Sequence, residues 1–144
     1  MTHSEIVEFA TKWLRKHDQN IIIPNCKIIA TELNTANCTG EIPDVIGFSS
    51  NQSILIEVKT SLADFAADAQ KKFREYPEIG MGANRYFLCP TDLIKPEQLP
   101  KNWGLLYIDK NGIITIVEKA KDCFFNVHAE KQMLYSILIR RGNE

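Results

Sequence analysis

Two short apolar runs that carry charge at their ends constrain the fold of this chain most. They are Asp44-Val-Ile-Gly-Phe48 and Ser53-Ile-Leu-Ile-Glu-Val-Lys59, and the polar segment Ser49-Ser-Asn-Gln52 between them has the composition of a tight turn. The pattern predicts two antiparallel strands that pair with each other. Because charge is costly at the end of a buried strand, we expect these acids and this lysine to have a chemical role.

The charged residues of the two runs are predicted to converge. Glu57 and Lys59 are two residues apart, so they point to the same face of a strand. Pairing across the turn brings Asp44 near the end of the second run. Two neighbouring carboxylates repel each other, and a divalent cation such as Mg2+ relieves this by taking oxygen ligands from both. A lysine beside that cation could orient a water or stabilise a phosphoryl group, so the trio has the parts for metal-assisted phosphodiester hydrolysis.

Helices and further strands are predicted around this pair. Apolar residues at helical spacing predict one helix over residues 4–17, with Ser4 as its cap, and another over 61–77. Strands are predicted over 27–33 and 85–89. In the second helix the cap is Ser61 and the predicted apolar stripe comprises Leu62, Phe65, Ala66, Ala69, Phe73 and Tyr76.

The C-terminal part is predicted to add a hairpin and a helix. Strands over 103–109 and 113–117 flank an Asn-Gly pair, which is the strongest short-range hairpin signal in the chain. A helix over 129–140 is expected to bury Met133, Leu134, Ile137 and Leu138. The order of elements predicts an α/β fold with one central mixed sheet flanked by helices.

Size and composition favour one domain spanning residues 1–144. The formal charge of -1 gives the whole molecule no cationic field, so binding to nucleic acid would need a local basic patch or a partner. No apolar run approaches the roughly 18 to 20 residues of a membrane span, and the start lacks a signal pattern, so we expect a cytoplasmic location and no membrane contact. The four cysteines have no zinc-site spacing and are expected to be reduced.

The motif Pro43-Asp44 followed on the next strand by Glu57-Val58-Lys59, framed by helices, resembles the PD-(D/E)xK nuclease superfamily. The resemblance spans roughly residues 4–89, and the segment 61–77 looks like the MmcB-type DNA-repair branch. It implies a restriction-endonuclease-like core of order α-β-β-β-α-β, here followed by the C-terminal hairpin and helix. It also implies that Asp44 and Glu57 hold Mg2+ or Mn2+, with the Val58 backbone carbonyl as a further ligand, and that Lys59 assists catalysis.

The resemblance suggests additional site residues. Many members of the superfamily carry a further acid, and Glu5, Glu8 and Glu32 are the candidates here; Glu32 lies on an element that leads directly to the site. Gln70 matches a helical position where several members have glutamine or lysine. The basic residues predicted to contact DNA are Lys72 and Arg74.

Ordinary structural roles are the alternative for each residue. Glu57 and Lys59 could form a solvated pair on an exposed sheet edge, which would contribute little to stability. The helix 61–77 could present a solvated charged face, because Asp64, Asp68 and Glu75 interleave its basic residues. The histidines His3, His17 and His128 are scattered, and we expect no site role for them.

Two functions remain open from the sequence. The first is a metal-dependent DNA nuclease that acts in DNA repair or processing, with DNA as partner and a homodimer or a larger repair complex as its assembly. The second is a nuclease-like fold without catalysis that binds DNA or serves as an assembly module.

Overall fold

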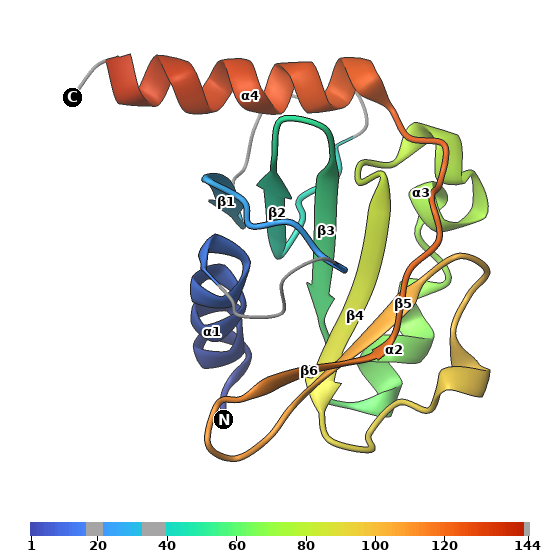
Figure 1. Cartoon of the computed structure of the whole chain (residues 1–144). Helices are drawn as coiled ribbons and strands as arrows, with labels where there is room; N and C mark the ends of the chain where they lie inside the picture. Colours follow the sequence, from blue (N-terminus) through green and yellow to red (C-terminus); the bar gives the residue numbers. More distant parts are fainter. Residues whose placement is uncertain (17–21, 33–39, 143–144) are drawn as a thin grey trace.

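Six strands form one mixed sheet in which the spatial order equals the order along the chain (Figure 1). The computed structural model describes residues 1–16, 22–32 and 40–142. The strands are β1 (Ile28–Thr31), β2 (Val45–Phe48), β3 (Ser53–Val58), β4 (Asn84–Pro90), β5 (Gly104–Ile108) and β6 (Ile114–Glu118). Neighbours pair antiparallel except β3 with β4 and β4 with β5, which are parallel. The predicted α/β fold with a mixed sheet is confirmed.

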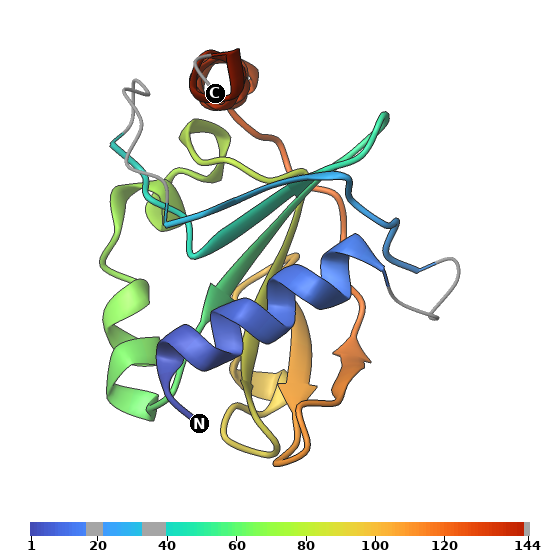
Figure 2. The same cartoon turned by 90° about the vertical axis from the view of Figure 1, so that its left-hand side faces the viewer.

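Helices cover both sides of the sheet. They are α1 (His3–Arg15), α2 (Leu62–Asp68), α3 (Lys72–Glu75) and α4 (Val127–Gly142), with 3-10 turns η1 (Pro77–Ile79) and η2 (Pro96–Gln98). Figure 2 shows α1 and α4 on opposite sides of strands β1 to β3. None of the helices in the described ranges is long and apolar enough to cross a membrane.

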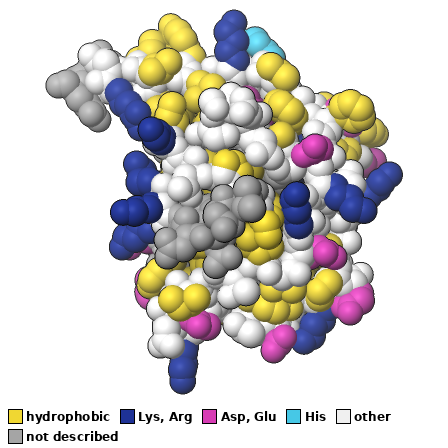
Figure 3. Space-filling model, viewed as in Figure 1, with side chains coloured by type: hydrophobic (Ala, Val, Ile, Leu, Met, Phe, Trp, Pro, Cys, Tyr) yellow, Lys and Arg dark blue, Asp and Glu magenta, His cyan; other side chains and the backbone are white. Residues whose placement is uncertain are grey.

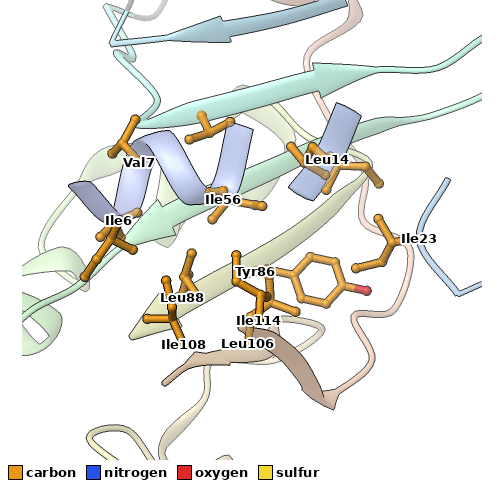
Figure 4. Packing of buried hydrophobic residues seen from close by; sticks show 14 of the residues in the cluster. Ile6, Val7, Leu14, Ile23, Ile56, Tyr86, Leu88, Leu106, Ile108 and Ile114 are labelled. Carbon is orange, nitrogen blue, oxygen red and sulfur yellow. The ribbon is translucent and has the colours of Figure 1, made fainter. Parts of the chain in front are cut away.

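The face covered by α1 holds an apolar core (Figure 4). Ile6, Ala10 and Leu14 lie along one side of α1 and are fully buried, as helical spacing predicts. They pack against inward-facing side chains of the strands, among them Ile56, Tyr86, Leu88, Leu106 and Ile108. Burial of this many large aliphatic side chains stabilises the α1 face through the hydrophobic effect.

The opposite face is covered by α4, α2 and the segment before β5. Met133 and Ile137 of α4 are buried over the β1 to β3 part of the sheet. Near β4, the rings of Phe87 and Trp103 stack with centroids 4.2 Å apart, and Phe65 of α2 meets Phe87 edge-on at 5.0 Å. This second core leaves room near the ends of β2 and β3 for the charged side chains described below.

Both predicted hairpins are present. The Ser49 backbone N–H donates to the Gln52 carbonyl at 2.9 Å and closes the turn between β2 and β3. In the turn between β5 and β6, Gly112 has a φ of +84°, a conformation that favours glycine. The Asp109 carboxylate accepts hydrogen bonds from the N–H groups of Asn111 and Ile113, each at 2.9 Å, and rigidifies this turn.

The prediction of one amphipathic helix over 61–77 is wrong. Ser61 caps α2 as expected, accepting a hydrogen bond from the Asp64 N–H at 3.1 Å, but the helix breaks after Asp68 and resumes as α3. Phe65 and Phe73 are partly buried, whereas the rest of the predicted stripe is exposed: Leu62, Ala66, Ala69 and Tyr76. The buried residue of α2 is Asp68, whose ion pairs fix this segment against the sheet together with the contact of Phe65 with Phe87.

Smaller differences concern helix ends and one core residue. Thr2, and not Ser4, caps α1 by accepting a hydrogen bond from the Glu5 N–H at 3.2 Å. Leu138 is 63% exposed, because the buried apolar residues of α4 repeat every four positions from Ala129 to Ile137 and Leu138 lies outside that row, towards the free C-terminal end of the helix. The predicted element ends at 17 and 33 lie outside the described residues. So does Cys38, while the other cysteines are free thiols.

Candidate functional site

Asp44 and Glu57 meet where β2 begins and β3 ends. The register pairs Val45 with Ile56, so Asp44 and Glu57 are the next residues opposite each other. Asp44 Oδ2 accepts a hydrogen bond from the Val58 backbone N–H at 2.8 Å, which fixes the carboxylate, and the side chains of Asp44 and Glu57 are within hydrogen-bonding reach. The hairpin therefore brings these two acids together as its pairing predicts. At Val58 the observed contact uses the amide; the carbonyl as a metal ligand stays a prediction.

Glu57 is a buried acid. Its residue is 2% exposed, and burial together with the negative charge of Asp44 raises the pKa of its carboxyl to about 8, against the opposing positive charges of Arg74 and Lys71. The alternative of a solvated Glu57–Lys59 pair is therefore wrong. The two side chains do share a face of the sheet, but each pairs with a different partner.

Arg74 is the partner of Glu57. Its Nη2 lies 3.1 Å from Glu57 Oε1, its Nη1 lies 3.4 Å from Glu41 Oε2, and its Nε donates to Asp68 Oδ2 at 2.6 Å. The guanidinium also lies over the Trp103 ring, 4.6 Å from the centroid. The side chain is only 4% exposed. Arg74, predicted to contact DNA, is not an exposed cation, because three buried acids hold its guanidinium inside; Lys72, on the same helix, is exposed.

Lys59 points into the same charged network. Its Nζ lies 3.0 Å from Asp68 Oδ1, and the Nζ of Lys71 lies 2.9 Å from the same oxygen. Burial alone would raise the pKa of Asp68, but the charge of Arg74 and hydrogen bonds from Lys71, Arg74 and Lys59 lower it below its ordinary value. Lys59 is thus held by an ion pair beside the two acids of the hairpin.

A more open group of side chains lies on the other side of Asp44. The His3 Nε2 is 3.3 Å from Asp44 Oδ2, and the His3 Nδ1 is 3.6 Å from Glu32 Oε1. One ligand atom from each of the three residues lies within 4.8 Å of the others. Glu32 turns out of β1 with a φ of +44°, and its side chain is 53% exposed, compared with 19% for Asp44. This side of Asp44 is therefore reached by solvent.

Several sequence predictions about this neighbourhood can now be compared with the geometry. Among the candidates for the additional acid, Glu32 is the one linked to Asp44, because the two ring nitrogens of His3 lie next to the two carboxylates. Glu5 and Glu8 are exposed on α1, and Glu5 instead contacts the capping Thr2. Gln70 is exposed at the break between α2 and α3. His3, for which no site role was expected, lies beside Asp44, because α1 brings its first turn to the start of β2.

Two buried acids of the network were missed from the sequence. Glu41 is 1% exposed and accepts the Met81 N–H at 2.7 Å as well as bonding Arg74, and Asp68 was expected on a solvated face. Asp68 and Arg74 would lie on different sides of one continuous helix, so only the break between α2 and α3 brings them together. Glu41 offered a signal, because it begins the apolar stretch that contains Asp44.

The donor set around Asp44 is suited to a hard divalent cation. The group whose ligand atoms lie within 4.8 Å of one another comprises His3, Glu32 and Asp44; Glu57 lies beside Asp44 but is not part of it. The two carboxylates of the group offer oxygens of the kind that Mg2+ prefers, and the His3 imidazole is better suited to a transition metal such as Mn2+. The crowding of Asp44 against Glu57 is the kind of like-charge contact that a cation relieves. The chemistry of the residues present therefore fits a metal at this position.

Comparison with known proteins bears on the fold only. No protein-family model matches the chain. No curated protein matches it either. A solved structure of a protein of unknown function from Silicibacter pomeroyi is similar, with a TM-score of 0.59 and 25% sequence identity over 79% of this chain and 75% of that one. The similarity shows that this α/β arrangement occurs in another protein.

Proposed function

We propose that the protein is a metal-dependent DNA nuclease that hydrolyses phosphodiester bonds. The observation that carries the proposal is the contact of Asp44 with Glu57 at the end of the β2–β3 hairpin, with Lys59 on the same strand and solvent on the His3 side of Asp44. The motif resemblance to the PD-(D/E)xK superfamily and the order α1-β1-β2-β3-α2-β4 support it. A role in DNA repair rests on that resemblance alone.

The residues divide into metal ligands and positioning groups. Asp44 and Glu57 would hold Mg2+ or Mn2+, and Glu32 would add a ligand from the solvent side. Arg74 bonds Oε1 of Glu57 and would help to position that carboxylate. A metal bound there would supply a Lewis acid and a water of lowered pKa. Lys59, fixed by Asp68, would orient the attacking water or stabilise charge on the phosphoryl group.

Substrate contacts would come from exposed cations. Lys72 on α3 is one, and on the other side of the molecule Figure 3 shows lysine and arginine side chains along the left-hand edge of the view, where α1, β1 and the end of α4 lie. A homodimer or a larger repair complex would add further cations, since affinity for DNA rises with the number of phosphates neutralised. Sedimentation analysis tests that part: a monomer that cuts DNA at full rate would contradict it.

The test is cleavage of labelled single-stranded, duplex and branched DNA with Mg2+ or Mn2+. Near-isosteric variants keep the packing: Asp44→Asn, Glu57→Gln and Lys59→Met. We expect each to lose activity by about 100-fold or more. Lys110→Met, an exposed lysine in the β5–β6 turn, is the matched control and should cut normally. Cleavage that survives all three site variants would overturn the proposal.

Metal binding offers a readout independent of cleavage. Titration with Mn2+ monitored by electron paramagnetic resonance should show a site in the wild type that is lost in Asp44→Asn and weakened in Glu32→Gln. Glu8→Gln is the control, because Glu8 is exposed on α1 and has no contact with Asp44. Equal Mn2+ binding by Asp44→Asn would place any metal elsewhere.

A second function is favoured by a separate observation. Glu57 Oε1 and the Lys59 ammonium already have protein partners in Arg74 and Asp68, which is the arrangement expected of a fold that binds DNA or a partner without cutting it. In that case no DNA substrate would be cleaved with either metal. Binding of DNA would persist unchanged in Glu57→Gln and Lys59→Met.

A further inference from the structure

A cavity separate from the Asp44 site shares one residue with it. The cavity has a volume of about 270 Å3 and lies among α3, the turn before β5 and the coil 119–126, and Arg74 lines it. Figure 1 shows this coil running beside α3 on its way to α4. Its other principal lining residues are Arg85, Lys101, Trp103 and Phe124. Cations and aromatic rings therefore meet in one hollow.

Arg85 is a buried cation whose hydrogen-bond partners, in the described part of the chain, are backbone carbonyls and not carboxylates. It is 1% exposed, and its Nε and Nη2 donate to the backbone carbonyls of Gly82, Pro77, Gly80 and Phe124 at 2.8 to 3.3 Å. Within the described residues its Nη1 makes no hydrogen bond, and no carboxylate lies within ion-pair distance of the guanidinium. Burial lowers the pKa of Arg85 and the charge of Arg74 lowers it further, against the opposing effects of Cys123, Glu41 and Glu130. An anion in the cavity would compensate this charge.

Phe124 presents an open aromatic face beside that cation. Its side chain belongs to a residue that is 87% exposed, although its backbone is fixed: Cys123 N–H donates to the Ala83 carbonyl at 2.9 Å, and the Phe124 carbonyl accepts from Arg85 at 3.0 Å. Trp103 cannot serve in the same way, because Phe87 stacks on its ring and Arg74 lies over it. A solvated phenyl ring on a fixed backbone is a surface on which another planar group can stack.

We propose that this cavity binds one unpaired nucleotide of a DNA strand, with its phosphate against Arg85 Nη1 and Lys101 and its base stacked on Phe124. The volume is just below the range of about 300 to 1,000 Å3 for small-molecule sites, which suits one nucleotide unit. An unpaired base is required because bases in a duplex stack on each other, whereas single strands stack on aromatic side chains in cationic grooves. The inference rests on the proposed function for its choice of DNA as the ligand.

Neighbouring charges define the extent of the site. Lys119 and Lys121 line an adjoining hollow that shares Lys101 and Trp103 with the cavity, so a strand could continue along them. Glu78 and Glu118 line the same two hollows and reduce the local positive charge. The site is therefore a local one, not a broad basic surface, which agrees with the net charge of -1.

The test is fluorescence anisotropy with a labelled oligothymidylate at low salt in EDTA, where no cleavage occurs. Phe124→Ala is expected to weaken binding about 5- to 100-fold, the range for removal of one base–aromatic stack, whereas Phe124→Tyr should bind normally. Lys101→Ala should weaken binding more at low salt than at high salt. Leu138→Ala, which removes another exposed apolar side chain, is the matched control. Arg85 is not substituted, because it donates hydrogen bonds to four backbone carbonyls and its removal would disturb the cavity itself.

Two further probes decide the class of ligand. A duplex of the same length should bind with little dependence on Phe124, and an acidic peptide should not compete with the oligothymidylate. Binding of the single strand that is unchanged in Phe124→Ala, or a loss that is equal for duplex and single strand, would overturn the inference. So would an acidic peptide whose binding is the one that depends on Phe124.

The inference and the proposed function fail separately. Single-strand binding that depends on Phe124 without cleavage in Mg2+ or Mn2+ would sink the nuclease proposal and leave the cavity assignment intact. Cleavage that depends on Glu57 and Lys59, together with binding indifferent to Phe124, would do the reverse.

Discussion

The two faces of the sheet bury different chemistry. Among the described residues, the buried polar side chain that shares the α1 face is the neutral Asn84, whereas the opposite face buries Glu41, Glu57, Lys59, Asp68, Arg85 and Glu130. The α1 face is held mainly by apolar packing. On the other face, stability depends on each buried charge having its partner, because an isolated buried charge is far more costly than a paired one. The buried charged side chains therefore lie on one face of the sheet, beside the second apolar core, and the α1 face has none among the described residues.

The largest effect is expected from removing the cation that joins the charged face. Arg74→Met should lower the free energy of unfolding by about 3–5 kcal/mol, because three buried acids lose their common partner. Urea denaturation measures this. Lys72→Met, two residues away and exposed, should change stability by less than about 0.5 kcal/mol. Similar stabilities of the two variants would mean that the charged network contributes little.

A comparable loss is expected on the apolar face but by a different mechanism. Leu14→Ala leaves a cavity under α1 and should cost about 2–5 kcal/mol. The affinity of the folded Leu14→Ala protein for Mn2+ should be unchanged, because Leu14 lies on the other face of the sheet from Asp44. Leu138→Ala on the exposed side of α4 is the control for the same change of side chain. A changed metal affinity in Leu14→Ala would show that the two faces are coupled.

The stability of the charged face should depend on pH through Asp68. The pKa of Asp68 is lowered in the folded protein, so the folded state binds fewer protons at this carboxyl than the unfolded state does. In the unfolded state an aspartate has a pKa of about 3.9. The contribution of Asp68 is therefore fully present above that value and is lost as the pH falls through the folded pKa. Asp68→Asn should flatten the fall in stability below about pH 4, measured by urea denaturation at successive pH values. An unchanged slope in the variant would argue against this role.

The smallest effect is expected at the start of α1. Thr2→Ala removes the side-chain oxygen that accepts the Glu5 N–H and should lower stability by about 1 kcal/mol. Thermal unfolding followed by circular dichroism measures it. Ser4→Ala is the control, because Ser4 lies inside the helix and not at its cap. A larger loss in Ser4→Ala than in Thr2→Ala would contradict the assigned cap.

Local patterns in the sequence predicted the sheet well. Alternation and turn chemistry predicted the β2–β3 and β5–β6 hairpins, since both signals act over a few neighbouring residues. The same pairing predicted that Asp44 and Glu57 would meet. The fate of residues 61–77 could not be predicted this way, because ion pairs with distant partners outweighed the helical pattern and split it between Asp68 and Lys72.

Side chains brought in from distant segments explain the rest. His3 reaches Asp44 only through the placement of α1, across a sequence separation of 41 residues. Arg74 was predicted to contact DNA, yet two of its three acid partners, Glu41 and Glu57, come from segments that no local pattern connects to its helix. Long-range electrostatics of this kind carries no periodic signal in the sequence.

The order of the strands has a consequence for how the chain acquires its structure during synthesis. Each strand pairs with its immediate neighbour along the chain, so the antiparallel pairs can form from short closures, whereas the parallel β3–β4 and β4–β5 pairs need longer closures that slow folding. Met133 and Ile137 are translated after the strands they cover. Until α4 emerges from the ribosome, the apolar side chains of β1 to β3 on that face remain uncovered, and the nascent chain is most prone to aggregation in this interval.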